Sequence, residues 1–173
     1  MEKRKKKFML LLFLINLMIQ IFGGIYYDRT PAFVWALADA IILMVPLVFD
    51  LWYGLLFLLP VSVSELAWFF KLGTVGPLLH LTSFAVAVFL LGLAGEKLKT
   101  AQLSRRIVIS SFLFEVSLLC EEVLYRVLFR LFLGRNITWK SVSGPFLSPA
   151  NLLILAVLVV IILEDKNRAS EKK

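Results

Sequence analysis

Residues 152–163 read Leu-Leu-Ile-Leu-Ala-Val-Leu-Val-Val-Ile-Ile-Leu, an apolar stretch with no alternating polar residues. A strand of a membrane barrel alternates between apolar and polar residues, so this stretch predicts a helix instead. Similar apolar stretches recur along the chain, and several approach the ~20 residues that cross the hydrocarbon core of a bilayer. Backbone amides in lipid must find hydrogen bonds within the protein, which again favours helices.

The composition supports a membrane protein. Of the 173 residues, 60% are hydrophobic and 18% are charged, and the mean hydropathy is +0.88. A soluble domain usually has about 25% charged residues. The charges gather at the ends of the apolar stretches, so the net charge of +7 indicates membrane topology and contact with anionic lipid head groups, not nucleic-acid binding. The single Cys120 forms no intrachain disulfide, and we expect it to be a small buried side chain.

We predict an all-α fold, a polytopic bundle of six transmembrane helices with no separate soluble domain. Pro31 should open the second helix, and Asp50 should mark a very short turn. Polar loops are expected over residues 96–106 and 134–144. The helices are predicted at about residues 8–25, 32–49, 51–70, 78–94, 107–133 and 145–163, between a basic N-terminus (1–7) and a charged tail (164–173).

Most of the 19 Lys and Arg residues lie in three regions: the N-terminus, the loop after the fourth predicted helix, and the tail. Six spans place all three regions on one side of the membrane, whereas five or seven spans would divide them. Because positively charged loops stay in the cytoplasm, both termini are predicted to be cytoplasmic. The expected location is the inner (cytoplasmic) membrane of a bacterial cell.

Several ionisable residues fall inside the predicted spans. Such groups are costly in lipid and usually face the protein interior or a wet cavity, often in pairs. From the rise of ~1.5 Å per residue, Asp39 and Arg126 should lie at one depth and Glu65 and Arg130 nearer the outer surface. The predicted polar cluster comprises Asp39, Glu65, His80, Glu115, Glu122, Arg126 and Arg130, and His80 is expected in the outer half of the bundle as well.

The spacing within the fifth predicted helix suggests how this cluster is arranged. Glu122, Arg126 and Arg130 recur every fourth residue and therefore share one face, and Glu115 lies one heptad earlier. Three interpretations stay open: ion pairs that hold the helices together, an outward-facing polar pocket for a ligand or a partner segment, and a proton or ion path. The inner half is nearly uncharged, which disfavours a path across the whole membrane.

No enzyme motif stands out. The chain has one His, and it lacks GxSxG, P-loop and HExxH motifs. Glu121-Glu122-Val-Leu-Tyr-Arg126 has the Glu-Glu-x-x-x-Arg spacing of some intramembrane proteases, but those enzymes need further His or Asn ligands on later helices. Neighbouring helical residues point about 100° apart, so Glu121 and Glu122 do not form a dyad by themselves. We predict a protein that is not an enzyme, with no cofactor, catalytic residue or metal site.

One region carries a family resemblance. After the acidic Glu65 comes Gly73-Thr-Val-Gly76-Pro-Leu-Leu-His80-Leu, followed by an apolar helix that ends in small and basic residues through Leu98. This layout, with six helices and a basic N-terminus, resembles the family of the rod shape-determining protein MreD. Family members more often carry Asp where Glu65 stands, and their loop is shorter.

The resemblance implies a non-enzymatic membrane scaffold of the bacterial cell-elongation complex, which supports peptidoglycan synthesis and cell shape. The implied partners are the membrane helix of MreC, a RodA-type glycosyltransferase and a class-B penicillin-binding transpeptidase. The family is also distantly similar to the S components of energy-coupling-factor transporters. The alternative function is therefore a substrate-binding component of a vitamin or metal transporter, which would use the outer pocket.

Overall fold

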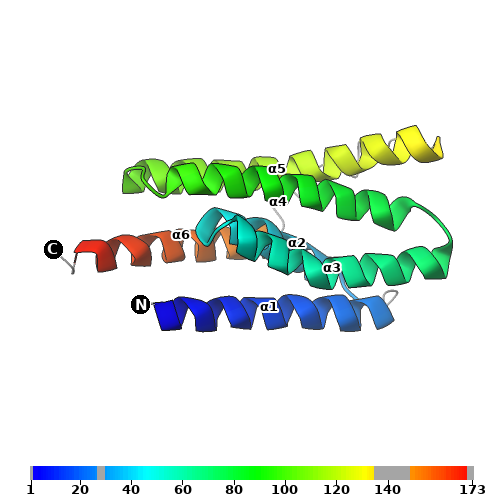
Figure 1. Cartoon of the computed structure of the whole chain (residues 1–173), viewed down its shortest axis with the longest axis horizontal. Helices are drawn as coiled ribbons and strands as arrows, with labels where there is room; N and C mark the ends of the chain where they lie inside the picture. The colour runs from blue at the N-terminus through cyan, green and yellow to red at the C-terminus, as the bar shows by residue number, and fades with distance from the viewer. Residues whose placement is uncertain (1, 27–29, 135–148, 171–173) are drawn as a thin grey trace.

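The computed structural model describes residues 2–26, 30–134 and 149–170, which form six helices (Figure 1). No strand occurs in these segments, so the predicted all-α fold is confirmed. The helices run along one long axis, and α1 begins at the same end of the molecule at which α6 ends (Figure 1). The helices are α1 (Glu2–Ile25), α2 (Ala32–Val48), α3 (Leu51–Leu72), α4 (Gly76–Leu98), α5 (Leu103–Leu133) and α6 (Pro149–Ser170).

Several helices are longer than the apolar stretches that predicted them. α1 begins at Glu2 rather than near residue 8, and α4 continues to Leu98. The loop expected over residues 96–106 therefore shrinks to the few residues between Leu98 and Leu103. Lys, Arg, Glu and Leu are all good helix formers, so a helix continues past the last residue that lipid would tolerate.

The C-terminal part also differs from the prediction. α6 continues to Ser170, so most of the predicted charged tail is helical. The expected loop over residues 134–144, except Gly134, and the first predicted residues of the sixth helix, 145–148, lie outside the described residues.

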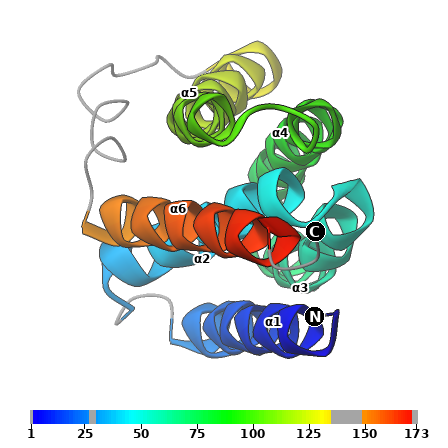
Figure 2. The ribbon, with the colours of Figure 1, turned by 90° about the vertical axis from the view of Figure 1, so that its left-hand side faces the viewer.

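α2 forms the centre of the bundle and contacts all five other helices. Every residue from Ala40 to Phe49 is buried. Viewed from one end, α4 and α5 form one layer, α2, α3 and α6 form the next, and α1 lies on the far side (Figure 2). A helix that is apolar on all sides must be surrounded by protein or lipid, and here protein surrounds it.

The two ends of the bundle are built differently. At the α2–α3 end, the short turn at Phe49 and Asp50 joins the helices, and the Asp50 carboxylate accepts a hydrogen bond of 3.1 Å from the backbone N–H of Tyr53. Asp50 is thus an N-cap, which satisfies one of the free amides at the start of α3. At the α3–α4 end, Gly73 ends α3 with a φ of +63°, a conformation that favours glycine.

Glycines let α4 approach the α2–α3 end closely. A Cβ added to Gly95 would lie 2.6 Å from the carbonyl oxygen of Pro46 and 3.1 Å from the Cα of Leu47. A Cβ at Gly92 would lie 2.6 Å from the side chain of Leu51. Small residues at these positions therefore allow close helix packing.

The outside of the bundle is apolar. Large side chains are exposed on α1, α3, α4 and α5, for example Leu11, Trp52, Phe70, Leu90 and Phe112. Within the described residues, three helices are long and apolar enough to cross a membrane: α1 over Lys6–Gly23, α3 and α4. α2 and the Pro149–Glu164 part of α6 are shorter apolar helices. Exposed apolar surface on this scale is unusual for a soluble monomer, and it is consistent with a membrane protein.

The expectation for Cys120 is wrong, because its side chain is exposed. The residue lies on α5 immediately before the buried Glu121, and one step along a helix rotates the side chain by about 100°.

Candidate functional site: a polar pocket and an apolar groove

A pocket of about 800 Å³ opens at the α3–α4 end, between α2, α3, α4 and α5. Its polar side chains include Asp39 from α2, Glu65 and Lys71 from α3, and His80 from α4. Its aromatic side chains are Trp35, Trp68, Tyr125 and Phe129. We call this the polar pocket. Its volume lies within the range of small-molecule sites.

His80 is the central polar residue of the polar pocket. Its Nδ1 lies 2.7 Å from Oε1 of Glu65, and its Nε2 lies 3.8 Å from Oε1 of Glu121. The imidazole therefore lies between carboxylates from α3 and α5. At 2.7 Å the first contact is a hydrogen bond, in which Nδ1–H donates to the Glu65 carboxylate because an ionised carboxylate can only accept.

Ser83 completes this cluster. Its hydroxyl lies 2.6 Å from Oε1 of Glu121 and 2.8 Å from the backbone oxygen of His80. Glu121 is almost fully buried, with 7% of its side chain exposed. We refer to Glu65, His80, Ser83 and Glu121 as the acid–histidine cluster. It ties α3, α4 and α5 together below the polar pocket.

Ser83 was not among the predicted site residues, and Glu121 was considered only as a possible dyad with Glu122. A signal for both residues exists in the sequence. Ser110, Phe114, Ser117 and Glu121 recur at heptad spacing and form the buried face of α5, and Ser83 lies one turn after His80. A stripe of small residues that marks a packed helix face would have placed Glu121, rather than Glu122, toward the interior.

Aromatic rings surround the histidine. The His80 ring centroid lies 5.1 Å from that of Tyr125 and 4.9 Å from that of Phe84, both in edge-to-face geometry. At the mouth of the pocket, the Lys71 ammonium lies 4.4 Å from the centre of the Trp68 ring. The pocket thus combines carboxylates with aromatic faces, and one of those faces already holds a cation.

The structure separates the predicted polar cluster into two groups. Asp39, Glu65 and His80 line the polar pocket together, whereas Glu115, Glu122, Arg126 and Arg130 do not. Arg126 donates a 2.6 Å hydrogen bond from Nε to Glu122 one turn earlier on α5. Among the described residues, Glu115 and Arg130 form no ion pair.

The ion pairs expected from equal depth in the membrane therefore differ from the pairs observed in the structure. Glu65 meets His80 rather than Arg130, which is exposed near the end of α5. Arg126 pairs with Glu122 rather than bonding directly to Asp39. The physical reason is local: a carboxylate one turn away, or on the next antiparallel helix, is closer than one at equal depth across the bundle.

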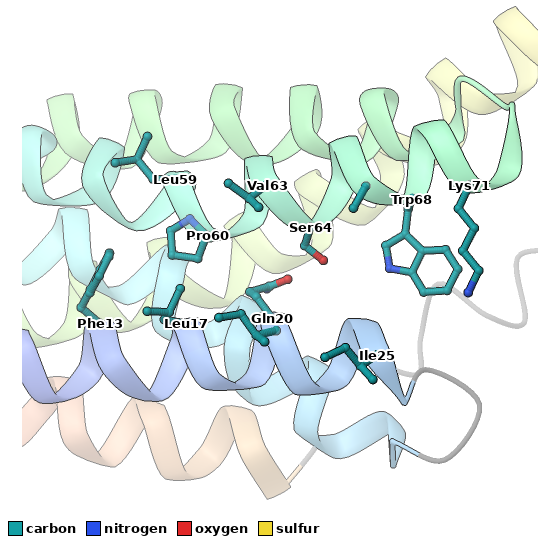
Figure 3. Close-up of a pocket in the computed structure, with 12 residues that line it drawn as sticks. Phe13, Leu17, Gln20, Ile25, Leu59, Pro60, Val63, Ser64, Trp68 and Lys71 are labelled. Carbon is teal, nitrogen blue, oxygen red and sulfur yellow. The ribbon is translucent and has the colours of Figure 1, made fainter.

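An apolar groove of about 420 Å³ runs between α1 and α3 (Figure 3). We call this the α1–α3 groove. It is lined by Phe13, Leu17, Gln20, Ile21, Ile25, Leu59, Pro60, Val63, Ser64, Ala67, Trp68 and Lys71. The lining residues recur about every fourth position on both helices, so the groove follows the helix axes for about three turns, roughly 16 Å.

Two polar side chains interrupt this groove. Gln20 from α1 and Ser64 from α3 point toward one another across it (Figure 3). One turn earlier on α1, the buried Asn16 donates a 3.3 Å hydrogen bond from Nδ2 to the backbone oxygen of Phe57 on α3. This bond joins α1 to α3. Ser64, Trp68 and Lys71 line both the α1–α3 groove and the polar pocket.

Within the described segments, no group of three His, Cys, Asp or Glu side chains could hold a metal ion. No family model, curated protein or solved structure matches the chain. The likeness to a transporter S component therefore stays a prediction, and function is inferred from the polar pocket and the α1–α3 groove.

Proposed function

We propose that all six helices cross the inner membrane of a bacterial cell, with both termini in the cytoplasm. The apolar exterior supports this placement. The start of α1, the end of α6 and the α4–α5 connection all lie at the α2–α3 end (Figure 1). The same end carries the basic Lys6, Lys7, Lys97, Lys99 and Arg105, as expected for a cytoplasmic face. The polar pocket then opens toward the outside of the cell.

We further propose that the protein is a non-enzymatic scaffold of the bacterial cell-elongation complex, related to MreD. In this role it binds the membrane helix of an MreC-like partner and works beside a RodA-type glycosyltransferase and a class-B penicillin-binding transpeptidase. The sequence resemblance over residues 65–98 suggests the role. The observation that carries it is the α1–α3 groove, a surface shaped to receive another helix.

Three properties of the α1–α3 groove suit a transmembrane helix. It lies along the helix axes over about three turns. Ser64 and Ala67 are small, so a partner backbone can approach closely. Gln20 and Ser64 supply hydrogen-bonding groups within an otherwise apolar lining, and such groups stabilise helix pairs inside membranes. A helix in an apolar groove is a common mode of recognition.

Site-specific photo-crosslinking in the native membrane tests this proposal. A photoreactive residue at Val63, which is exposed in the groove, should crosslink to an MreC-like protein. The matched control is Leu90, which is similarly exposed on α4 away from the groove. Crosslinking of lipid alone at Val63, or equal capture of the partner from both positions, would contradict the proposal.

The polar pocket favours a second candidate function, the substrate-binding component of an energy-coupled vitamin or metal transporter. A scaffold needs no pocket of about 800 Å³ lined by charged and aromatic side chains. Copurification from the native membrane separates the two functions. An MreC-like partner supports the scaffold, and an ATPase-containing module supports the transporter.

A further inference from the structure

The polar pocket carries more negative than positive charge. Asp39 and Glu65 line it, and Glu121 lies directly beneath His80. The nearby cations are Lys71 and, when protonated, His80. Three carboxylates therefore exceed two cations even when His80 is charged. Glu122 does not change this balance, because it pairs with Arg126.

Asp39 is the carboxylate that this cluster leaves unsatisfied. It is partly buried, and the charges that act on it are His80, which when protonated favours its ionised form, and Glu121, Glu65 and Glu122, which oppose that form. Among the residues that the structure describes, none forms a hydrogen bond or an ion pair with its side chain. An ionised carboxylate at this depth is costly unless a cation meets it.

The walls of the pocket suit an organic cation better than a hydrated metal ion. Trp35 lies one turn before Asp39 on α2 and lines the same pocket, as do Trp68, Tyr125 and Phe129. Aromatic faces attract alkylammonium groups and exclude the water that a small inorganic cation would retain. The Lys71 ammonium over Trp68 shows that this wall accepts such a group.

We propose that the polar pocket binds a molecule with an alkylammonium group, which lies against Asp39 between the aromatic side chains. This inference goes beyond the scaffold role and, for the second candidate function, names the class of substrate. The ammonium could belong to a free solute or to a zwitterionic lipid head group, since both present the same chemistry.

Choline is a suitable soluble probe, because its neutral isostere 3,3-dimethyl-1-butanol has the same shape without the charge. With purified protein in phospholipid-free detergent, choline should raise the melting temperature and the isostere should not, since a ligand that binds only the folded state stabilises it. In nanodiscs, a rise with phosphatidylcholine but not with phosphatidylglycerol would instead identify a lipid head group as the source.

Two variants locate the site. Asp39→Asn should weaken choline binding at least about tenfold, and Trp68→Leu should weaken it about tenfold through the lost aromatic face. Trp68→Leu also keeps the test informative if Asp39→Asn fails to fold. The matched control Glu96→Gln, exposed at the opposite end, should bind normally.

A response to neither choline nor phosphatidylcholine, equal responses to choline and its isostere, or normal binding by both pocket variants would overturn the proposal. The groove crosslink has a separate readout, so this failure would leave the scaffold proposal standing.

Discussion

The two ends of this bundle use the same helices in opposite ways. At the α2–α3 end, glycines bring α4 so close that an added Cβ at Gly95 would lie 2.6 Å from a backbone oxygen of α2. At the α3–α4 end, α2, α3 and α4 surround a pocket of about 800 Å³, which is lined by carboxylates, a histidine and aromatic rings.

The difference shows that side-chain size and polarity set the helix spacing separately at each end. Small side chains permit direct backbone contact, which stabilises helix pairs by packing alone. Charged side chains cannot be covered by lipid, so they stay inside and need room for partners. The first end is therefore held by direct packing of helices, and the second leaves a pocket between them.

The largest effect on stability is expected from adding a large side chain at the tightly packed α2–α3 end. Gly95→Leu places a side chain against the backbone of Pro46 and Leu47, which cannot move aside. It should destabilise the protein by about 3 kcal/mol or prevent folding, as measured by thermal unfolding in detergent. Ala156→Leu, at an exposed position on α6, is the control and should be neutral. An unchanged melting temperature for Gly95→Leu would remove the contrast between the two ends.

A smaller effect is expected from the ion pair on α5. Arg126→Leu leaves the Glu122 carboxylate without its partner, and about 2 kcal/mol of stability should be lost, because the pair is only partly buried. Double variants identify the partner through the free energy of unfolding. Adding Glu122→Gln should restore part of the loss, whereas adding Asp39→Asn should not. If stability is restored by adding Asp39→Asn but not by adding Glu122→Gln, the Asp39–Arg126 pairing predicted from the sequence is favoured instead.

The smallest effect is expected within the acid–histidine cluster. Ser83→Ala removes the hydroxyl that donates to the buried Glu121 carboxylate, and should cost about 1.5 kcal/mol. Thr82→Ala is the matched control, since that hydroxyl is exposed and bonds only to the backbone of its own helix. The two variants can be compared by denaturant unfolding in the same detergent. Equal stability of the two variants would mean that the Ser83–Glu121 bond adds nothing.

Some features of the site followed from the sequence. Asp39, Glu65 and His80 were expected in one polar cluster, and all three line the polar pocket. The reason is general, because ionisable groups in apolar helices have few places to lie other than the interior. The side chains that pair with these residues could not be predicted from the sequence. Equal depth suggested Arg130 for Glu65, but His80 on the adjacent helix meets it at 2.7 Å.

The α1–α3 groove was not predicted. Its residues are almost all apolar, and nothing in an apolar helix pattern distinguishes a side chain that packs against a neighbour from one that faces a gap. Phe13 and Phe57, for example, meet in an edge-to-face contact of 5.4 Å, while Val63, further along the groove, is exposed.

The sequence by itself determined that this protein is all-helical, where its apolar stretches lie, and which residues are too polar to face lipid. These properties depend on hydrogen bonding and transfer free energies that act residue by residue along the chain. Only the tertiary structure decided that α2 is central, that His80 lies between Glu65 and Glu121, and that a pocket and a groove share Trp68. Those properties depend on which helix faces meet, and that choice is made by packing between residues far apart in the chain.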